Sequence, residues 1–443
     1  MARRRSKKLP VDLFTVDIES LTHEGKGVAH VDGKVVFVDG ALPSERVTFR
    51  YTEQKKSYDE GQAIEIIESS EDRVEPLCAH FGVCGGCSLQ HLSAETQIKS
   101  KSTILFDNLE RIGKVEAEKA LDPIVSHPWS YRRRARLGVK YVFKKEKVLV
   151  GFREKRSPYL ADISSCKVLD ERIGEKITEL CELIASLSLY QRIPQIEVAI
   201  GDDDIALVFR HLDALPESDE AKLVAFGQVH NFQIYGQIKG PTTIKKLWAP
   251  NENSLSFSLP EHDVKLNFRP SDFTQVNIDI NRQMVSRALG LLEIESDDRV
   301  LDLFCGLGNF TLPIARQAKY LVGVEGSEDL VQQARANAQA NNIDNVEFHA
   351  VDLTKSTEGL PWVSERYDKV LIDPPRSGAL EVMEFIAKMS PSRIVYVSCN
   401  PATLARDAHE LVNTYGYTLK QAGVMDMFPH TTHVESIAVF EKN

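Results

Sequence analysis

The sequence predicts an α/β protein. Its C-terminal part, residues 271–443, is expected to form an open, mostly parallel sheet, preceded by a small β-barrel and a strand-rich α+β region. Two observations predict the C-terminal fold. Beyond residue 299, short apolar runs alternate with helical segments, which is the rhythm of β-α-β units. Three of these runs also end in residues suited to chemistry: a glycine-rich turn, an Asp-Pro-Pro sequence and a cysteine.

Seven segments of this C-terminal part are expected to be strands. Five are parallel and joined by helical crossovers, and the last two form a terminal pair. They are Arg299–Phe304, Tyr320–Val324, Val346–Ala350, Lys369–Ile372 and Arg393–Val397, then segments near Tyr417–Met425 and Ser436–Glu441. This order is the architecture of class I methyltransferases, which is Rossmann-like. Ligands of open α/β sheets bind at the carboxyl ends of the strands, so the three motifs should converge on one pocket.

Residues 10–70 are expected to form a small barrel. Asp32-Gly33 between alternating apolar residues is a strong hairpin signal. About five strands in so short a stretch indicate a closed barrel of the oligonucleotide-binding type. The expected strands are Phe14–Leu21, Gly27–Val31, Val35–Val38, Val47–Tyr51 and Ala63–Ile67.

Residues 71–270 form the expected central domain. Residues 94–113 carry a rough apolar stripe and should be helical, and we expect this helix to pack on the catalytic domain. The rest is strand-rich, with one amphipathic helix near residues 170–188. Cys181 lies on the apolar face of that helix and is expected to be a core residue.

Composition excludes several classes of protein. The chain has no apolar run of about 18 residues and no charged-then-apolar leader, so we expect a cytoplasmic protein without a membrane span. Seven cysteines at uneven spacing argue against a secreted disulfide framework. No obligate protein partner is evident, and we expect a monomer.

The net charge of −10 hides a basic block in residues 130–160. Tyr131, Tyr141 and Phe143 are interleaved with the charges, which favours RNA over a merely solvated hairpin because bases stack on aromatic rings. The basic tail Ala2–Lys8 is expected to add to phosphate binding. The block contains Arg132, Arg133, Arg134, Arg136, Lys140, Lys144, Lys145, Lys147, Arg153, Lys155 and Arg156.

The glycine-rich turn Asp302-Leu-Phe-Cys-Gly-Leu-Gly-Asn-Phe310 predicts a nucleoside cofactor. Gly306 and Gly308 let the backbone approach a ligand closely. Glu325 ends the second strand, where a carboxylate accepts hydrogen bonds from ribose hydroxyls, and Asp352 ends the third, near an adenine amino group. A nicotinamide-binding domain is the competitor. The third glycine of its G-x-G-x-x-G motif is missing, so we favour S-adenosylmethionine.

Two further motifs indicate methyl transfer to a pyrimidine. Carbon-5 of a pyrimidine is a poor nucleophile until a thiolate adds to carbon-6. Cys399, in Val-Ser-Cys-Asn-Pro, is the candidate nucleophile. Asp373, in Asp-Pro-Pro-Arg, can form a hydrogen bond with the edge of the pyrimidine ring or with the methyl-donor region. Glu435, just before the last strand, is the candidate base for the carbon-5 proton.

These motifs resemble the RNA 5-methyluridine methyltransferase family over residues 271–443. The resemblance gives Cys399 the role of nucleophile and Glu435 that of base. It implies a cofactor shell of Gln275, Phe304, Asn309, Glu325, Asp352 and Asp373. It also implies that Phe273 and one arginine of the Arg132–Arg136 cluster lie near the RNA.

Cys78, Cys84 and Cys87 are close in sequence, and Cys166 is distant. All-cysteine zinc sites usually bring two C-x-x-C pairs, and only one is present here, so the spacing favours an iron–sulfur cluster while leaving zinc open. The ribosomal-RNA branch of the family carries this pattern with a 4Fe-4S cluster and an N-terminal TRAM barrel. The resemblance therefore implies methylation of a uridine in 23S ribosomal RNA.

Three other functions stay open. The transfer-RNA branch typically lacks the cluster and the barrel and is the runner-up. A non-catalytic RNA-binding protein with a redox-sensing cluster would not need Asp373, Cys399 and Glu435 together. A cytosine methyltransferase would carry Pro-Cys at strand four, where Pro375 is followed by Arg376.

Overall fold

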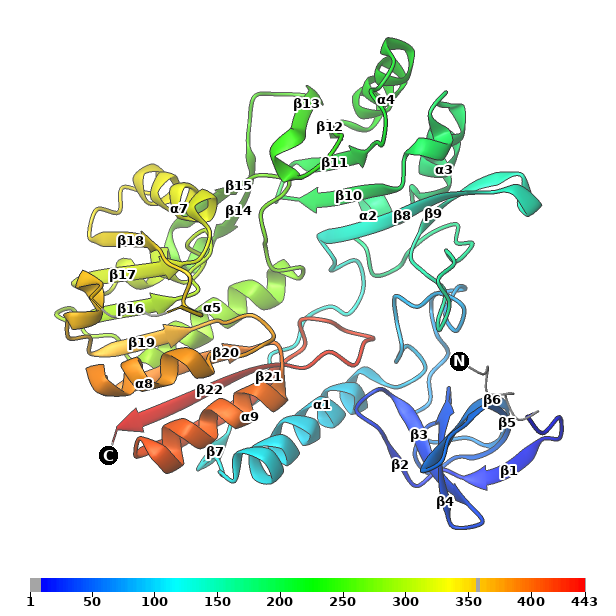
Figure 1. Cartoon of the computed structure of the whole chain (residues 1–443), viewed down its shortest axis with the longest axis horizontal. Coiled ribbons are helices and arrows are strands. Elements are labelled where there is room, and N and C mark those ends of the chain that lie inside the picture. The colour runs from blue at the N-terminus through cyan, green and yellow to red at the C-terminus, as the bar shows by residue number, and fades with distance from the viewer. Residues whose placement is uncertain (1–8, 356–358, 443) are drawn as a thin grey trace, which may run out of the picture. The chain divides into compact units, whose positions relative to one another are not determined.

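The computed structural model describes residues 9–355 and 359–442. The chain divides into two compact units: the chain up to Ser100 together with Pro429–Thr432, and Lys101–Phe428 together with the chain from His433 (Figure 1). The basic tail Ala2–Lys8 lies outside the described residues. The expected divisions at residues 70 and 270 stay predictions.

The first unit contains a six-stranded sheet in the order β1-β5-β6-β4-β3-β2. The segment containing β1 and β2 pairs with β5 at one end and β3 at the other, so it joins both edges of the sheet. The predicted Asp32-Gly33 hairpin is confirmed, with positive φ at both residues. The strands are β1 (Phe14–Asp17), β2 (Ser20–Leu21), β3 (Lys26–Val31), β4 (Lys34–Asp39), β5 (Arg46–Gln54) and β6 (Tyr58–Glu68).

β6 begins five residues before the strand predicted at Ala63–Ile67. Its first half, Tyr58–Gln62, is polar and does not resemble a strand in sequence. It pairs in parallel with β4 and antiparallel with β5, so hydrogen bonds on both edges fix it in the sheet.

Helix α1 (Ala94–Asn108) leads from the first unit into the second. The helix predicted over residues 94–113 is confirmed, and its last turn widens into a π-helix at Leu109–Gly113. A side chain at Gly113 would lie 2.7 Å from the carbonyl oxygen of Ala405, so glycine permits this turn to pack on α9 (Pro401–His409). This contact lies wholly within the second unit.

The second unit contains a central sheet in the order β13-β12-β11-β10-β8-β9. A separate hairpin, β14 and β15, follows it. The central elements are β8 (Arg134–Val142), β9 (Lys147–Gly151), α2 (Glu171–Gly174), α3 (Ile177–Ser186), β10 (Gln195–Ile200), β11 (Ile205–Arg210), α4 (Glu217–His230), β12 (Gln233–Gln237), β13 (Ile244–Trp248), β14 (Leu255–Leu259) and β15 (Val264–Phe268), with 3-10 turns at Phe143–Lys145, Tyr190–Arg192, Pro241–Thr243 and Pro260–His262.

Two features of this region differ from the prediction. The helix expected near residues 170–188 is broken into α2 and α3. At the break, the backbone oxygen of Gly174 accepts a hydrogen bond of 2.8 Å from Cys166, and a Cβ atom at Gly174 would come within 2.3 Å of the Cys166 carbonyl oxygen. Helix α4 was not predicted. Few of its side chains are buried, among them Leu223. Its sequence therefore lacks the continuous apolar stripe that would predict a helix.

The sheet of the C-terminal part has the order β18-β17-β16-β19-β20-β22-β21-β7. β16 to β20 are parallel, and β22 inserts antiparallel between β20 and β21, which confirms the predicted class I architecture. The elements are β7 (Lys119–Ala120), α5 (Ile278–Leu292), β16 (Arg299–Leu303), α6 (Thr311–Ala315), β17 (Tyr320–Glu325), α7 (Glu328–Ala340), β18 (Val346–Ala350), β19 (Lys369–Ile372), α8 (Leu380–Met389), β20 (Arg393–Ser398), β21 (Tyr417–Met425) and β22 (Glu435–Lys442), with a 3-10 turn at Pro361–Ser364 and a π-helical turn at Glu410–Thr414.

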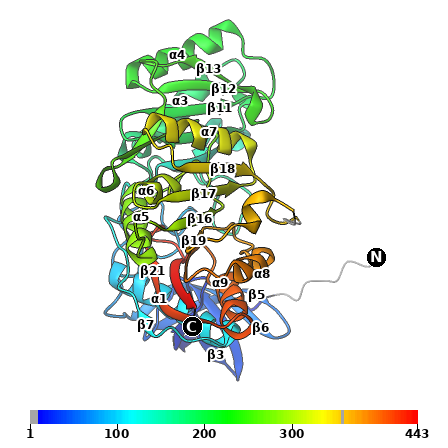
Figure 2. The same cartoon turned by 90° about the vertical axis from the view of Figure 1, so that its left-hand side faces the viewer.

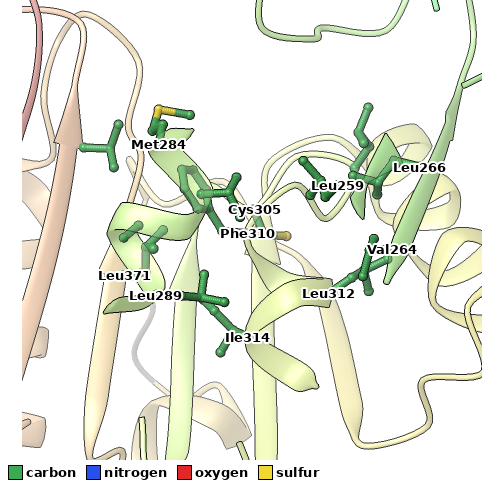
Figure 3. Packing of buried hydrophobic residues seen from close by; sticks show 14 of the residues in the cluster. Leu259, Val264, Leu266, Met284, Leu289, Cys305, Phe310, Leu312, Ile314 and Leu371 are labelled. Carbon is green, nitrogen blue, oxygen red and sulfur yellow. The ribbon is translucent and has the colours of Figure 1, made fainter. Parts of the chain in front are cut away.

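Helices cover both faces of this sheet, with α5 on one side and α8 and α9 on the other (Figure 2). The core between α5, α6 and the β14–β15 hairpin is apolar and contains Phe310 and Leu312 from the glycine-rich turn and α6 (Figure 3). Cys305 is buried in this cluster and packs within it. Across the described residues, no helix combines the length and apolar character needed to cross a membrane.

Candidate active site

Cys399 and Glu435 lie opposite each other where β20 and β22 meet. These strands are antiparallel, and their last paired residues are Ser398 and Ser436. Cys399 is the next residue along one strand and Glu435 the preceding residue along the other, so the register places them face to face. The structure thus brings together the two residues assigned to the reaction.

Asp373 follows β19, the neighbour of β20, and forms an acidic cluster with Cys399 and Glu435, since its charge acts on both. Burial raises the pKa of Asp373 to about 7. Burial and the charge of Asp373 raise the pKa of Glu435 to about 8. Burial and both carboxylates raise the pKa of the Cys399 thiol to about 11. The acidic cluster therefore favours neutral carboxyl groups, and a thiolate forms most easily when both are protonated.

Two features favour the thiolate. The Arg376 guanidinium opposes the rise in the pKa of Cys399 and of Glu435. Its Nη2 lies 3.1 Å from Nδ1 of His433, and its backbone oxygen accepts a hydrogen bond from the Asn400 side chain. Asn400 also caps helix α9, so Cys399 stands just before a helix N-terminus, where negative charge is stabilised.

The glycine-rich turn leaves β16 through Phe304, whose φ of 65° is unusual for a non-glycine residue. Gly306 follows with φ of 55°, and a Cβ atom there would meet nothing within 4 Å. Glu325 holds the turn from β17: one carboxylate oxygen accepts from the backbone N–H of Gly306 at 3.1 Å and the other from Ser327 at 3.0 Å. The space beside Gly306 is open, and a carboxylate borders the turn, as a nucleoside ligand requires.

The other predicted cofactor residues differ in setting. The Asn309 and Asn281 side chains form two reciprocal hydrogen bonds of 2.9 Å, which fix the turn to α5. Gln275 is half-buried in the segment between β15 and α5. Asp352 is exposed beyond β18, and hydrogen bonds from Thr354 and Lys355 lower its pKa to about 2.

Asp302 was not singled out as a site residue, although it begins the glycine-rich motif. It is completely buried, and Thr311 donates a hydrogen bond of 2.5 Å to one oxygen. The other oxygen, Oδ1, accepts no hydrogen bond from the described residues. Burial and the charges of Asp373 and Glu325 raise the pKa of Asp302 to about 8. Together with the open space at Gly306, this arrangement fits S-adenosylmethionine, whose cationic sulfonium would be stabilised by nearby carboxylates.

The four proposed cluster ligands lie in separate parts of the chain. Cys78, Cys84 and Cys87 belong to the first unit and Cys166 to the second. Backbone hydrogen bonds from Phe81 to Cys78 and from Cys84 to His80 fold the chain around Cys78 and Cys84 into tight turns. Within residues 9–355 and 359–442, no group of three or more His, Cys, Asp or Glu side chains is arranged to hold a metal ion.

The basic block is divided between structural and exposed residues. Arg132 and Arg134 donate to backbone oxygens, and Arg133 forms a 2.8 Å ion pair with Asp202. Arg136, Lys140, Lys144 and the aromatic Phe143 are exposed on the β8–β9 hairpin. The exposed part of the block is therefore the hairpin, whereas most of the Arg132–Arg136 cluster supports the fold. Phe273, beside Gln275, is also exposed.

Comparisons with known proteins agree with this geometry. The family model described as tRNA (Uracil-5-)-methyltransferase matches residues 94–443, and a TRAM domain model matches residues 7–64. A solved structure of Pyrococcus abyssi tRNA (uracil-54, C5)-methyltransferase in complex with S-adenosyl-L-homocysteine has a TM-score of 0.75 and 25% sequence identity. It covers 96% of this chain and 100% of that chain.

Curated relatives match over essentially the whole length. The protein named 23S rRNA (uracil(1939)-C(5))-methyltransferase RlmD from Alkalilimnicola ehrlichii is 52% identical over 99% of both chains. The protein of the same name from Hahella chejuensis is 53% identical over 100% of both chains. The family model and these relatives show that the chain belongs to the uracil-5-methyltransferase family of RNA-modifying enzymes.

Proposed function

We propose that this protein methylates carbon-5 of a uridine in 23S ribosomal RNA, with S-adenosylmethionine as the methyl donor. The observation that carries the proposal is the register of β20 and β22, which places Cys399 opposite Glu435 beside Asp373. A thiolate facing a carboxyl group of raised pKa supplies both groups that carbon-5 substitution needs.

The reaction follows from the residues of the acidic cluster. The Cys399 thiolate adds to carbon-6 of the uracil, and the electron pair of the ring moves toward carbon-5 and the oxygen of carbon-4. S-adenosylmethionine supplies the methyl group that carbon-5 takes up. Glu435 then removes the carbon-5 proton, the bond from carbon-6 to sulfur breaks, and the double bond of the ring is restored. The base must leave its stack to reach Cys399.

The choice of 23S rRNA over tRNA rests on the relatives. Those with 52% to 53% identity over the whole chain are named for 23S rRNA. The solved structure from Pyrococcus abyssi is named for tRNA but is only 25% identical to this chain. The exposed hairpin and the TRAM-like barrel support RNA binding. We further propose that the enzyme acts in the cytoplasm as a monomer.

A strain that lacks the protein tests this function. Mass analysis of its 23S rRNA should show one 5-methyluridine fewer than in the parent strain. Purified protein should restore that methyl group in the presence of S-adenosylmethionine. Loss of 5-methyluridine from tRNA with unchanged 23S rRNA would support the tRNA alternative instead.

We propose that the exposed β8–β9 hairpin binds RNA phosphates. Replacing Arg136, Lys140 and Lys144 with alanine should weaken RNA binding because positive charge facing the backbone is lost. The slope of log affinity against log salt should fall by roughly one unit per lost phosphate contact. Fluorescence anisotropy at several salt concentrations measures both quantities.

The matched control is Lys388→Ala, because Lys388 is an exposed lysine of α8 paired with Glu384. The control changes the charge in the same direction and should leave the slope unchanged. An unchanged slope in the triple variant would mean that the hairpin is only a solvated surface.

We propose that Cys78, Cys84, Cys87 and Cys166 bind a 4Fe-4S cluster. The thiol donor set suits iron–sulfur chemistry. The described side chains are not gathered into a ligand group, so the proposal rests on the sequence pattern and on the family resemblance. We assign the cluster no part in methyl transfer, because the four cysteines lie outside the strands of the catalytic sheet.

Anaerobically purified protein should then be brown and contain iron and sulfide. Cys84→Ser should lose both, whereas Cys181→Ser should keep them because Cys181 lies on helix α3 and is not a proposed ligand. Metal analysis and the visible absorption spectrum provide the measurements. Colourless protein with one tightly bound zinc would favour the zinc alternative.

A further inference from the structure

Helix α1 carries a buried lysine that the reaction as described does not use. The side chain of Lys101 is 2% exposed, and its Nζ lies 2.6 Å from the Asp426 carboxylate, itself 8% exposed. The same Nζ donates to the backbone oxygen of Phe428 at 3.0 Å. An ammonium group so completely removed from water is stable only because it is paired and hydrogen-bonded.

Both partners of Lys101 belong to the loop that joins β21 to β22. Asp426 directly follows Met425, and Met425 is the cross-strand partner of Glu435. The backbone N–H of Asp426 also donates a hydrogen bond of 2.8 Å to the backbone oxygen of Ile124. Lys101 therefore fixes the loop within one residue of the strand pairing that holds the proposed base.

A second buried side chain of α1 binds the next part of the loop. Gln97, one helical turn before Lys101, accepts a hydrogen bond of 2.8 Å from the backbone N–H of His430. Its amide nitrogen donates to the backbone oxygens of Leu89 and Leu92 at 3.0 and 2.8 Å. These contacts lie within the first unit, which includes Pro429–Thr432. His430 is held with φ of 64°, a conformation that persists only where the surroundings enforce it.

We infer that Lys101 is a positioning residue for Glu435: its ion pair with Asp426 and its bond to Phe428 hold the loop that sets the place of the Glu435 carboxylate. The inference rests on the proposed function, in which Glu435 removes the carbon-5 proton. Methyl transfer requires Cys399 and the cofactor pocket, but the proton-removal step requires Glu435 within hydrogen-bond reach of carbon-5. Loss of Lys101 should therefore slow release of methylated RNA far more than methyl transfer.

Electrostatics supports the same assignment. The positive charge of Lys101 opposes the rise in the pKa of Glu435, and it adds to the burial and the other cationic charges that lower the pKa of His433. The lysine is thus close enough for its charge to act at the site, although it lies about 330 residues before the base in sequence.

The test separates release from methyl transfer. The variant is Lys101→Met/Asp426→Ala, which removes both charges and leaves no unpaired ion in the core. Single-turnover transfer of a labelled methyl group measures the first step, and decay of the denaturant-stable protein–RNA adduct measures the second. We expect methyl transfer within about threefold of the parent and release slower by about 10-fold to 100-fold, the usual cost of a small misplacement. The decay rate of an adduct already formed does not depend on the fraction of protein that is folded.

Lys99→Met is the matched control, because Lys99 lies on the same helix with its side chain 68% exposed. It should release RNA at the parent rate. If the double variant does not fold, Asp426→Asn, which keeps the accepting oxygen and removes its charge, takes its place under the same criteria. Release at the parent rate would overturn the inference.

Glu435→Gln is assayed beside these variants. If it retains RNA while the Lys101 variant releases at the parent rate, only the inference falls. If Glu435→Gln releases RNA like the parent, the proposed base is wrong and the inference falls with it.

Discussion

Cys399→Ala should abolish methylation, with a loss of at least about 10⁴-fold, because alanine cannot add to carbon-6 as the proposed thiolate does. RNA containing 5-fluorouridine should trap the parent protein as a covalent adduct, since fluorine replaces the carbon-5 proton that must leave. The variant should form no such adduct. A gel in denaturant with labelled RNA detects the trapped species.

Cys181→Ala is the control for this experiment. Cys181 lies on α3 and carries a thiol whose pKa burial raises, but it is remote from β20 in the fold. It should trap RNA as the parent does. Equal trapping by Cys399→Ala would remove Cys399 from the mechanism.

Glu435→Gln should methylate RNA once and then fail to release it. The amide cannot take the carbon-5 proton, so the covalent species should accumulate with ordinary uridine RNA, and release should slow by about 10²-fold to 10⁴-fold. Single-turnover transfer of the labelled methyl group should persist. Rapid turnover by this variant would exclude Glu435 as the base.

The pH dependence of release follows from the raised pKa of Glu435. Only the deprotonated carboxylate accepts a proton, and its pKa is about 8. Release by the parent should therefore accelerate about tenfold per unit of pH below 8 and level off above it. In Glu435→Gln, the rate of RNA release should no longer depend on pH in this way. Adduct decay measured between pH 6 and 9 tests this.

The same shift predicts how Glu435→Gln affects stability. The native carboxyl group keeps its proton to about pH 8, whereas the group in the unfolded chain ionises near its ordinary value of 4.5. Between these values the unfolded state binds fewer protons, so the free energy of unfolding of the parent falls as pH rises. The variant lacks this loss and should be at least as stable as the parent at pH 8. Failure to release RNA could then not be attributed to unfolding.

Much of the catalytic domain was predictable from local sequence. Strongly apolar runs predicted β16 to β20, and the Asp32-Gly33 turn predicted a hairpin of the barrel. Cys399 and Asp373 were found because each follows such a run directly, and the carboxyl end of a parallel strand is where ligands bind. The glycine-rich turn was recognisable because its backbone conformations need residues without a Cβ atom.

The sequence by itself determined which motifs follow which strands, and which reactive side chains these motifs supply at the strand ends. Only the tertiary structure decided that Glu435 faces Cys399, because cross-strand register depends on pairing between distant segments. Only it revealed Lys101, whose polar side chain looks like a surface residue until its partner on a far loop is known. Likewise, burial raises the pKa values of Asp302, Asp373 and Glu435, and the charge of Asp373 adds to the rise at Asp302 and Glu435. Burial and long-range pairing are properties of the folded chain, and no local pattern encodes them.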